Sequence, residues 1–333
     1  MHHVRRSLGG RTRAAALKRL VAHPVIDALR ERPADARLAL VIEGGGMRGA
    51  VSGGMVLGLD DLGLADAFDA AYGSSAGALN AMWFVAGRAQ EGAPTWADAT
   101  FADSLVRRRR ALVHRPIVDV RGLIEERYEQ RSPGIFAATL AAPTELHPLA
   151  TDVSDGSAVD VHDAIADERT LRLALRASAS LPLLAGPPVE LAGRRLLDAG
   201  LSAAIPIRAA IADGATHILV LRSRRAGETA QPPSPRSMAI TKRLLRRIDP
   251  AVAAAFATRP EREARDEVLL ARHDAGPQLT PHILSLRPPA SSPVPTRLER
   301  DLASSGRHST EAGRRRMRCS PRLAESTMRR RSR

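Results

Sequence analysis

Short apolar runs alternate with helix-length segments along the first two thirds of the chain. Arg37–Glu43 is an apolar run of strand length, and it leads through glycines into a helix of small and apolar residues over 50–62. A second run, 67–72, leads through another glycine turn into a second helix. A short run that is apolar throughout fits a parallel strand buried on both faces. Strand, turn and helix in this repeated order predict a parallel α/β sheet.

The later part of the chain extends this sheet. Further strands are predicted over 146–153, 216–221 and 281–286, and a β-hairpin with strands 187–191 and 194–197 flanks Ala192-Gly193. Helices are predicted over 168–179, from near Pro206, and over 238–271 with a break at Asp249-Pro250. We therefore expect a three-layer α/β/α fold with a mainly parallel central sheet.

Composition divides the 333 residues into three parts. Residues 1–36 form a basic lead-in, 37–286 carry the α/β pattern, and 287–333 are rich in Arg, Pro and Ser, which favours disorder. The net charge is +14, and the last part holds thirteen arginines against four acidic residues. Most of the net positive charge therefore lies in residues 287–333, outside the α/β domain.

Cysteine content, hydropathy and aromatic content indicate the cellular compartment and the class of partner. The single cysteine, Cys319, rules out an internal disulfide and fits a reducing compartment. The N-terminus lacks the apolar core of a secretory signal, and no stretch approaches the ~20 apolar residues of a membrane span. We expect a cytoplasmic protein that meets membranes only peripherally, through basic surface or the tail. Aromatic residues make up 3% of the chain, so we expect no nucleic-acid partner.

The turn after the second strand has the sequence Gly73-Ser74-Ser75-Ala76-Gly77, a G-x-S-x-G pattern. Glycines on both sides of the central serine remove side chains that would clash in a tight strand-to-helix turn. Such a turn holds Ser75 strained at its tip, with the hydroxyl exposed at a helix N-terminus. The alternative is an ordinary glycine-rich loop.

The turn after the first strand is Gly44-Gly45-Gly46-Met47-Arg48-Gly49. Its backbone N–H groups are unshielded at the start of a helix and can hold an oxyanion. Arg48 adds a positive charge, as an anion contact or as a structural tie. The run also satisfies G-x-G-x-x-G, the dinucleotide fingerprint, but that fingerprint expects an acid at the end of the second strand, and Asp69 comes too early.

A third small-residue turn, Asp198-Ala199-Gly200, follows the hairpin. In a parallel sheet, turns after strands gather at the carboxyl edge, so we expect the three turns to converge. Together GGGMRG, GSSAG followed by ALNA, and Asp-x-Gly resemble the patatin-like phospholipase family. The likeness spans roughly 37–221 and also includes the segments Ala150–Asp152 and Arg176–Pro182.

The resemblance implies a patatin-like fold and hydrolysis of acyl esters of lipids or phospholipids by a Ser–Asp dyad. Carried over, Ser75 is the nucleophile and Asp198 its base. The implied oxyanion loop comprises Gly44, Gly45, Gly46, Met47, Arg48 and Gly49, and the elbow glycines are Gly73 and Gly77. A partly buried carboxylate can serve as the base when it bonds the serine hydroxyl directly.

One departure keeps a rival hypothesis open. The family usually has Gly where this chain has Ala199, and an alanine forced to positive φ costs about 1 kcal/mol. The rival is a non-catalytic lipid- or partner-binding protein that retains the fold. A conventional histidine base is not favoured, because His217 precedes a strand, at the edge opposite the expected site. No metal-ligand spacing occurs, and a hydrolase of this kind needs no cofactor.

Overall fold

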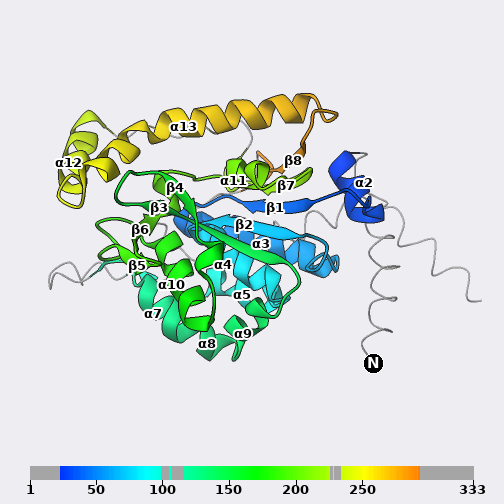
Figure 1. Cartoon of the computed structure of the whole chain (residues 1–333), viewed down its shortest axis with the longest axis horizontal. Helices are drawn as coiled ribbons and strands as arrows, with labels where there is room; N and C mark the ends of the chain where they lie inside the picture. Colours follow the sequence, from blue (N-terminus) through cyan, green and yellow to red (C-terminus); the bar gives the residue numbers. More distant parts are fainter. Residues whose placement is uncertain are drawn as a thin grey trace, which may run out of the picture.

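A mainly parallel sheet of eight strands lies between two layers of helices in the computed structural model (Figure 1). The structure describes residues 23–98, 105–106, 116–225, 228, 234–290 and 292. Most of the predicted lead-in and tail therefore lies outside the described residues. The arrangement confirms the predicted three-layer α/β/α class.

The sheet has the strand order β5-β6-β3-β2-β1-β7-β8, and β4 pairs with β3 beside this path. The strands are β1 Leu38–Ile42, β2 Ala70–Ser74, β3 Glu145–Asp152, β4 Ala158–Asp160, β5 Val189–Leu191, β6 Arg194–Asp198, β7 His217–Leu221 and β8 His282–Leu286. The pairs from β3 through β2, β1 and β7 to β8 are parallel. The pairs that involve β4, β5 and β6 are antiparallel.

The central strand β1 is buried on both faces, as its apolar run predicts. Leu38, Leu40 and Ile42 join one hydrophobic cluster, and Ala39 and Val41 join another. Because successive side chains of a strand point to opposite faces, each cluster fills the space between the sheet and one helical layer. The sequence needs no polar face here because water reaches neither side.

The helices of the two layers differ greatly in length, from the 3 residues of α7 to the 26 of α13. The α-helices are α2 Pro24–Glu31, α3 Gly49–Asp61, α4 Ala76–Val85, α5 Ala89–Gly92, α7 Val120–Gly122, α8 Tyr128–Arg131, α9 Ile135–Leu140, α10 Glu168–Ala179, α11 Ile207–Ala212, α12 Pro235–Leu245 and α13 Pro250–Ala275. Short 3₁₀ segments are η1 Gly46–Arg48, η2 Ala93–Ala97, η5 His162–Ala164 and η6 Ala199–Leu201, and η4 Leu123–Arg127 is π-helical.

Figure 1 shows α3, α4 and α10 on one side of the sheet and α11 and α13 on the other. None of the described helices is both long and apolar enough to span a bilayer.

Two local predictions need correction. The second strand is predicted to end at Tyr72, but β2 continues to Ser74, because Gly73 and Ser74 still pair with β3. The three-residue strand β4 is absent from the prediction, since Ala158–Asp160 is too short to show a period.

The predicted break at Asp249-Pro250 separates α12 from α13, with Asp249 capping the second helix.

Candidate active site

Ser75 occupies a strained turn between β2 and α4. Its φ of 55° and ψ of −125° are unusual for a residue with a side chain, and α4 begins at the next residue. A Cβ on Gly73 would lie 2.4 Å from the Ala78 Cα, and one on Gly77 would lie 2.3 Å from the Ile42 carbonyl oxygen. Only glycine fits at these two positions, so the G-x-S-x-G spacing is a packing requirement of this elbow.

The Ser75 hydroxyl donates a hydrogen bond to Asp198. The distance from Ser75 Oγ to Asp198 Oδ2 is 2.7 Å, and the two residues are 6% and 2% exposed. Burial of this kind keeps competing water away from the bond and strengthens it. The structure therefore brings together the serine and the aspartate that the two sequence turns singled out.

The route by which Asp198 reaches Ser75 differs from the prediction. We expected all three turns to lie at the carboxyl edge of parallel strands, but β6 runs antiparallel to β3. Asp198 lies opposite Ala150, and Ser74 lies opposite Leu149 on the other side of β3. β2 and β6 flank β3 on its two sides, and each ends next to the neighbouring residues Leu149 and Ala150 of β3. The ends of β2 and β6 therefore lie close together, although the two strands run in opposite directions.

Hydrogen bonds from both its carboxylate and its backbone fix Asp198. Besides accepting from Ser75, its carboxylate accepts from the Gly200 N–H at 2.7 Å. Its backbone N–H donates to the Ser180 carbonyl at 3.0 Å, and its carbonyl accepts from the Thr151 hydroxyl at 2.8 Å. Such a carboxylate is held in place before any substrate binds.

Ala199 does not carry the backbone strain that its departure from the family pattern suggested. It lies in η6 and is not among the described non-glycine residues with positive φ. The tight position is the next one, since a Cβ on Gly200 would lie 2.7 Å from Asp198 Oδ1. The cost of about 1 kcal/mol for an alanine at positive φ therefore does not apply to Ala199.

The glycine run divides into two parts. Gly44, Gly45 and Gly46 line the same cavity as Ser75 and Asp198. The Gly44 N–H donates to the Ala204 carbonyl at 3.0 Å, whereas the N–H groups of Gly45 and Gly46 donate to no other described residue. These two amides are the backbone donors of the run that remain available beside Ser75.

The other three residues of the run anchor it. Met47 is buried in the core, and Arg48 forms an ion pair with Glu228 at 2.9 Å. Gly49 begins α3 beneath Trp96, whose ring would lie 2.6 Å from an added Cβ. Arg48 thus has a structural partner, and none of the three lines the cavity.

A buried ionic network behind the glycine run was missed from the sequence. Glu43 at the end of β1 accepts from Arg222 Nε at 3.0 Å and from the Ser223 N–H at 2.7 Å, while Arg222 also pairs with Glu267. Burial by itself would lower the pKa of Arg222, but the carboxylates of Glu43 and Glu267 outweigh burial and raise that pKa, so the guanidinium stays protonated. The sequence does contain a signal for this network, because Glu43 and Arg222 directly follow the buried strands β1 and β7.

Two further polar residues were not singled out. Ser178 on α10 accepts the Ser75 N–H at 3.0 Å, so that amide is already used within the turn. Asn80 on α4 donates to the Gly49 carbonyl at 2.9 Å and accepts from Trp96 Nε1 at 2.9 Å. Asn80 therefore ties the elbow helix to the helix that follows the glycine run.

The cavity at Ser75 is small and mainly apolar. Its volume is about 240 Å³, and it is bounded by the segment Leu181–Leu184, by Leu201 and Ala204, and by residues of α12 and α13 that include Leu245 and Phe256. Arg259 is the one charged residue besides Asp198 in the described lining. This shape suits an apolar chain with its polar end at Ser75.

None of the described histidines lines this cavity. His147 and His162 stack with centroids 4.2 Å apart at a separate cavity of about 730 Å³, which excludes Ser75 and Asp198. His217 stands at the first position of β7, opposite the carboxyl end. Within the described ranges, no group of three or more His, Cys, Asp or Glu side chains is placed to hold a metal ion.

A strained serine between two close-packed glycines on a mainly parallel sheet defines an α/β protein with a nucleophile-elbow geometry. The sequence model of the family described as patatin-like phospholipase matches residues 40–211, about half of the chain. The chain belongs to this family, and membership indicates a lipid acyl hydrolase. No curated protein gives a significant match to the chain.

Proposed function

We propose that this protein is a serine acyl-ester hydrolase of lipids, with Ser75 as nucleophile and Asp198 as its base. The observation that carries the proposal is the 2.7 Å hydrogen bond between these two buried side chains on a strained elbow. A hydroxyl at hydrogen-bond distance from a fixed carboxylate can lose its proton as it attacks a carbonyl carbon.

The proposed reaction has two halves. Ser75 Oγ attacks the ester carbonyl while its proton passes to Asp198 Oδ2, and the carbonyl oxygen becomes an oxyanion. Collapse of this intermediate expels the alcohol, which takes the proton from Asp198. Water then attacks the acyl-enzyme with the same aspartate as base, and releases the fatty acid and free Ser75.

The amides of Gly45 and Gly46 are proposed as oxyanion donors. They border the cavity beside Ser75 and are not engaged by other described residues. The N-terminus of α4, which starts at Ala76, adds a partial positive charge at the same place. A donor of this kind contributes a factor of about 10²–10³ in rate.

An acyl ester of a lipid or phospholipid is the proposed substrate. The cavity of about 240 Å³ is below the ~300–1,000 Å³ of pockets that enclose a drug-sized ligand. It therefore suits one apolar chain, and leaves the rest of a lipid outside. We also propose residues 37–286 as the hydrolase domain, with α2 packed against it through Val25 and Leu29.

Two assays test the proposal. Wild-type protein should hydrolyse a short p-nitrophenyl acyl ester and be labelled by a fluorophosphonate probe, and Ser75→Ala should abolish both. Ser157→Ala, at an exposed serine, is the matched control and should retain both. An unlabelled, inactive wild-type protein would favour the rival, a binding protein that retains the fold. The feature that supported the rival, Ala199, no longer does so, because its φ is not positive.

A further inference from the structure

Helix α12 presents apolar side chains to solvent. Ile240 is 62% exposed and Leu244 is 36% exposed, and their spacing of four places them on one face of the helix. Leu245 is the only buried residue of α12, about 100° around the helix from Leu244. A helix that buries so little and exposes two large aliphatic side chains has an unused apolar face.

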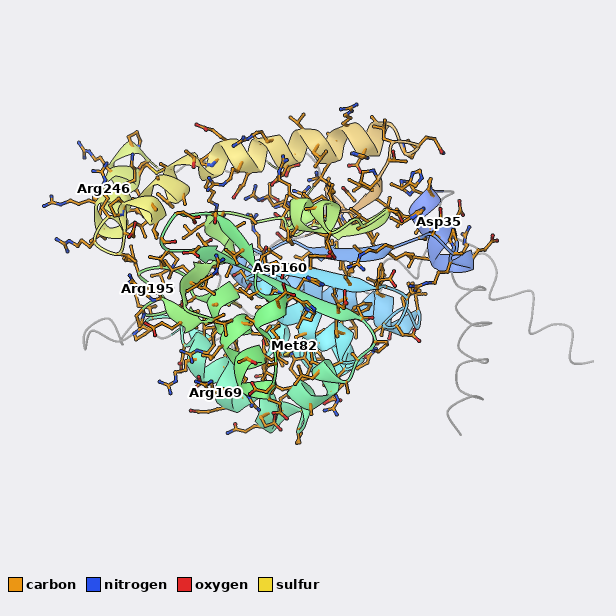
Figure 2. The ribbon with its side chains drawn as sticks, viewed as in Figure 1. Asp35, Met82, Asp160, Arg169, Arg195 and Arg246 are labelled. Carbon is orange, nitrogen blue, oxygen red and sulfur yellow. The ribbon has the colours of Figure 1, made fainter. Side chains whose placement is uncertain are left out.

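The same helix and the turn after it are strongly basic. The basic residues are Arg236, Lys242, Arg243, Arg246 and Arg247. None of them forms an ion pair with any described residue, although Arg259 on the adjacent helix is paired with Glu263. Figure 2 shows Arg246 directed outward at one end of the longest axis, the end that also carries Arg195 of β6. Cations that have no ion-pair partner in the described part of the chain thus surround the exposed apolar face.

This basic and apolar face adjoins the cavity at Ser75. Thr241 and Leu245 on the inner side of α12 line that cavity. Leu183 lines it as well, and its side chain is 44% exposed on a backbone with φ of 67°. Leu183, Ile240 and Leu244 are three of the five large hydrophobic residues exposed in the described part of the chain. Exposed apolar groups therefore concentrate around this one cavity.

We propose that the outward face of α12, together with Leu183, docks on an anionic lipid bilayer and sets the cavity against the membrane. Aliphatic side chains enter the headgroup region while arginines around them bind anionic headgroups, as in interfacial helices. A nucleic acid fits less well, because α12 carries no aromatic residue to stack on bases. The role of docking in substrate delivery rests on the proposed function, but docking itself does not require catalysis.

The test measures vesicle binding in full-length Ser75→Ala protein, so that turnover cannot alter the lipid. Cosedimentation is compared for vesicles of phosphatidylcholine alone and of phosphatidylcholine with phosphatidylglycerol. One variant combines Arg243→Gln with Arg247→Gln, and a second combines Ile240→Ser with Leu244→Ser. Their matched controls are Arg169→Gln with Arg272→Gln, and Val268→Ser, all at exposed positions away from α12. Thermal unfolding of each variant verifies that it folds.

Binding should require the anionic lipid and weaken by about tenfold or more in each α12 variant, with no change in the controls. Equal binding by the α12 variants and their controls would overturn the proposal. So would binding that is lost only on removal of residues 293–333, or α12-dependent binding to duplex DNA without binding to vesicles. Because hydrolysis of a soluble ester by wild type is measured separately, failure of the proposed function and failure of docking give different results.

Discussion

Ser75 and Asp198 share a hydrogen bond of 2.7 Å, although 123 positions separate them and their strands run in opposite directions. The bond depends on the carboxylate as acceptor. Asp198→Asn keeps an oxygen for the Gly200 N–H but removes the base. We expect kcat for a p-nitrophenyl ester to fall by a factor of about a thousand or more, with little change in stability. His217→Ala should leave kcat unaltered, and a fully active Asp198→Asn enzyme would contradict the dyad.

The elbow glycines should tolerate no side chain. In Gly77→Ala the new Cβ would meet the Ile42 carbonyl oxygen at 2.3 Å, so we expect a loss of about 1–3 kcal/mol in unfolding free energy. Gly58→Ala is the control, because no atom lies within 4 Å of the added Cβ in α3. It should raise stability by about 0.5–1 kcal/mol. Urea unfolding measures both, and an unaltered Gly77→Ala protein would argue against the close contact.

Substitution of the two residues after Asp198 should affect kcat differently. Ala199→Gly, which restores the usual family residue, should not raise kcat, because Ala199 does not need positive φ. Gly200→Ala places a Cβ 2.7 Å from Asp198 Oδ1, so the carboxylate must move and kcat should fall at least about tenfold. Steady-state kinetics distinguishes the two. A marked gain in Ala199→Gly would show that alanine limits the enzyme.

The network behind the glycine run should be costly to break. Arg222→Met removes the cation that faces Glu43 and leaves a buried carboxylate, for which we expect a loss of about 3–5 kcal/mol. Arg121→Met, which removes an exposed partner of Glu125, should leave the urea midpoint unchanged. Equal midpoints for the two variants would mean that the buried pair contributes nothing.

Stability should also depend on the protonation of His147. Burial lowers its pKa, but Asp160 at 2.7 Å and Glu145 outweigh burial, and the net pKa is raised. A raised folded pKa adds stability that is complete below the unfolded value of about 6.5 and is lost as pH rises through the folded pKa. The melting temperature of wild type should therefore fall toward that of His147→Gln as pH rises.

Histidines with a lowered pKa, such as His217, change stability with pH in the opposite direction. Because they are present in both wild type and His147→Gln, their effect cancels when the melting temperatures of these two proteins are compared. In an Asp160→Asn background, the melting temperatures of proteins with and without His147→Gln should differ by an amount that changes little with pH. A difference between wild type and His147→Gln that grows with pH would refute the assigned sign.

Much of the fold was predictable because its signals are local. The run Arg37–Glu43, the turns at Gly44 and Gly73, and the break at Asp249-Pro250 each constrain the backbone at their own positions. The strand before Asp198 is also predicted, over 194–197, but its antiparallel direction in the sheet is not. Direction depends on pairing with β3, which no local pattern encodes.

The sequence by itself determined where a strained turn must form, which glycines it needs, and which serine and aspartate follow strand ends. Only the tertiary structure decided that these two side chains meet across β3, that Ala199 avoids strain, and that Glu43 and Arg222 neutralise each other behind the glycines. Backbone sterics and hydrophobic periodicity act between near neighbours in the chain. Hydrogen bonds and ion pairs between distant residues depend on strand register, which is fixed only when the whole sheet assembles.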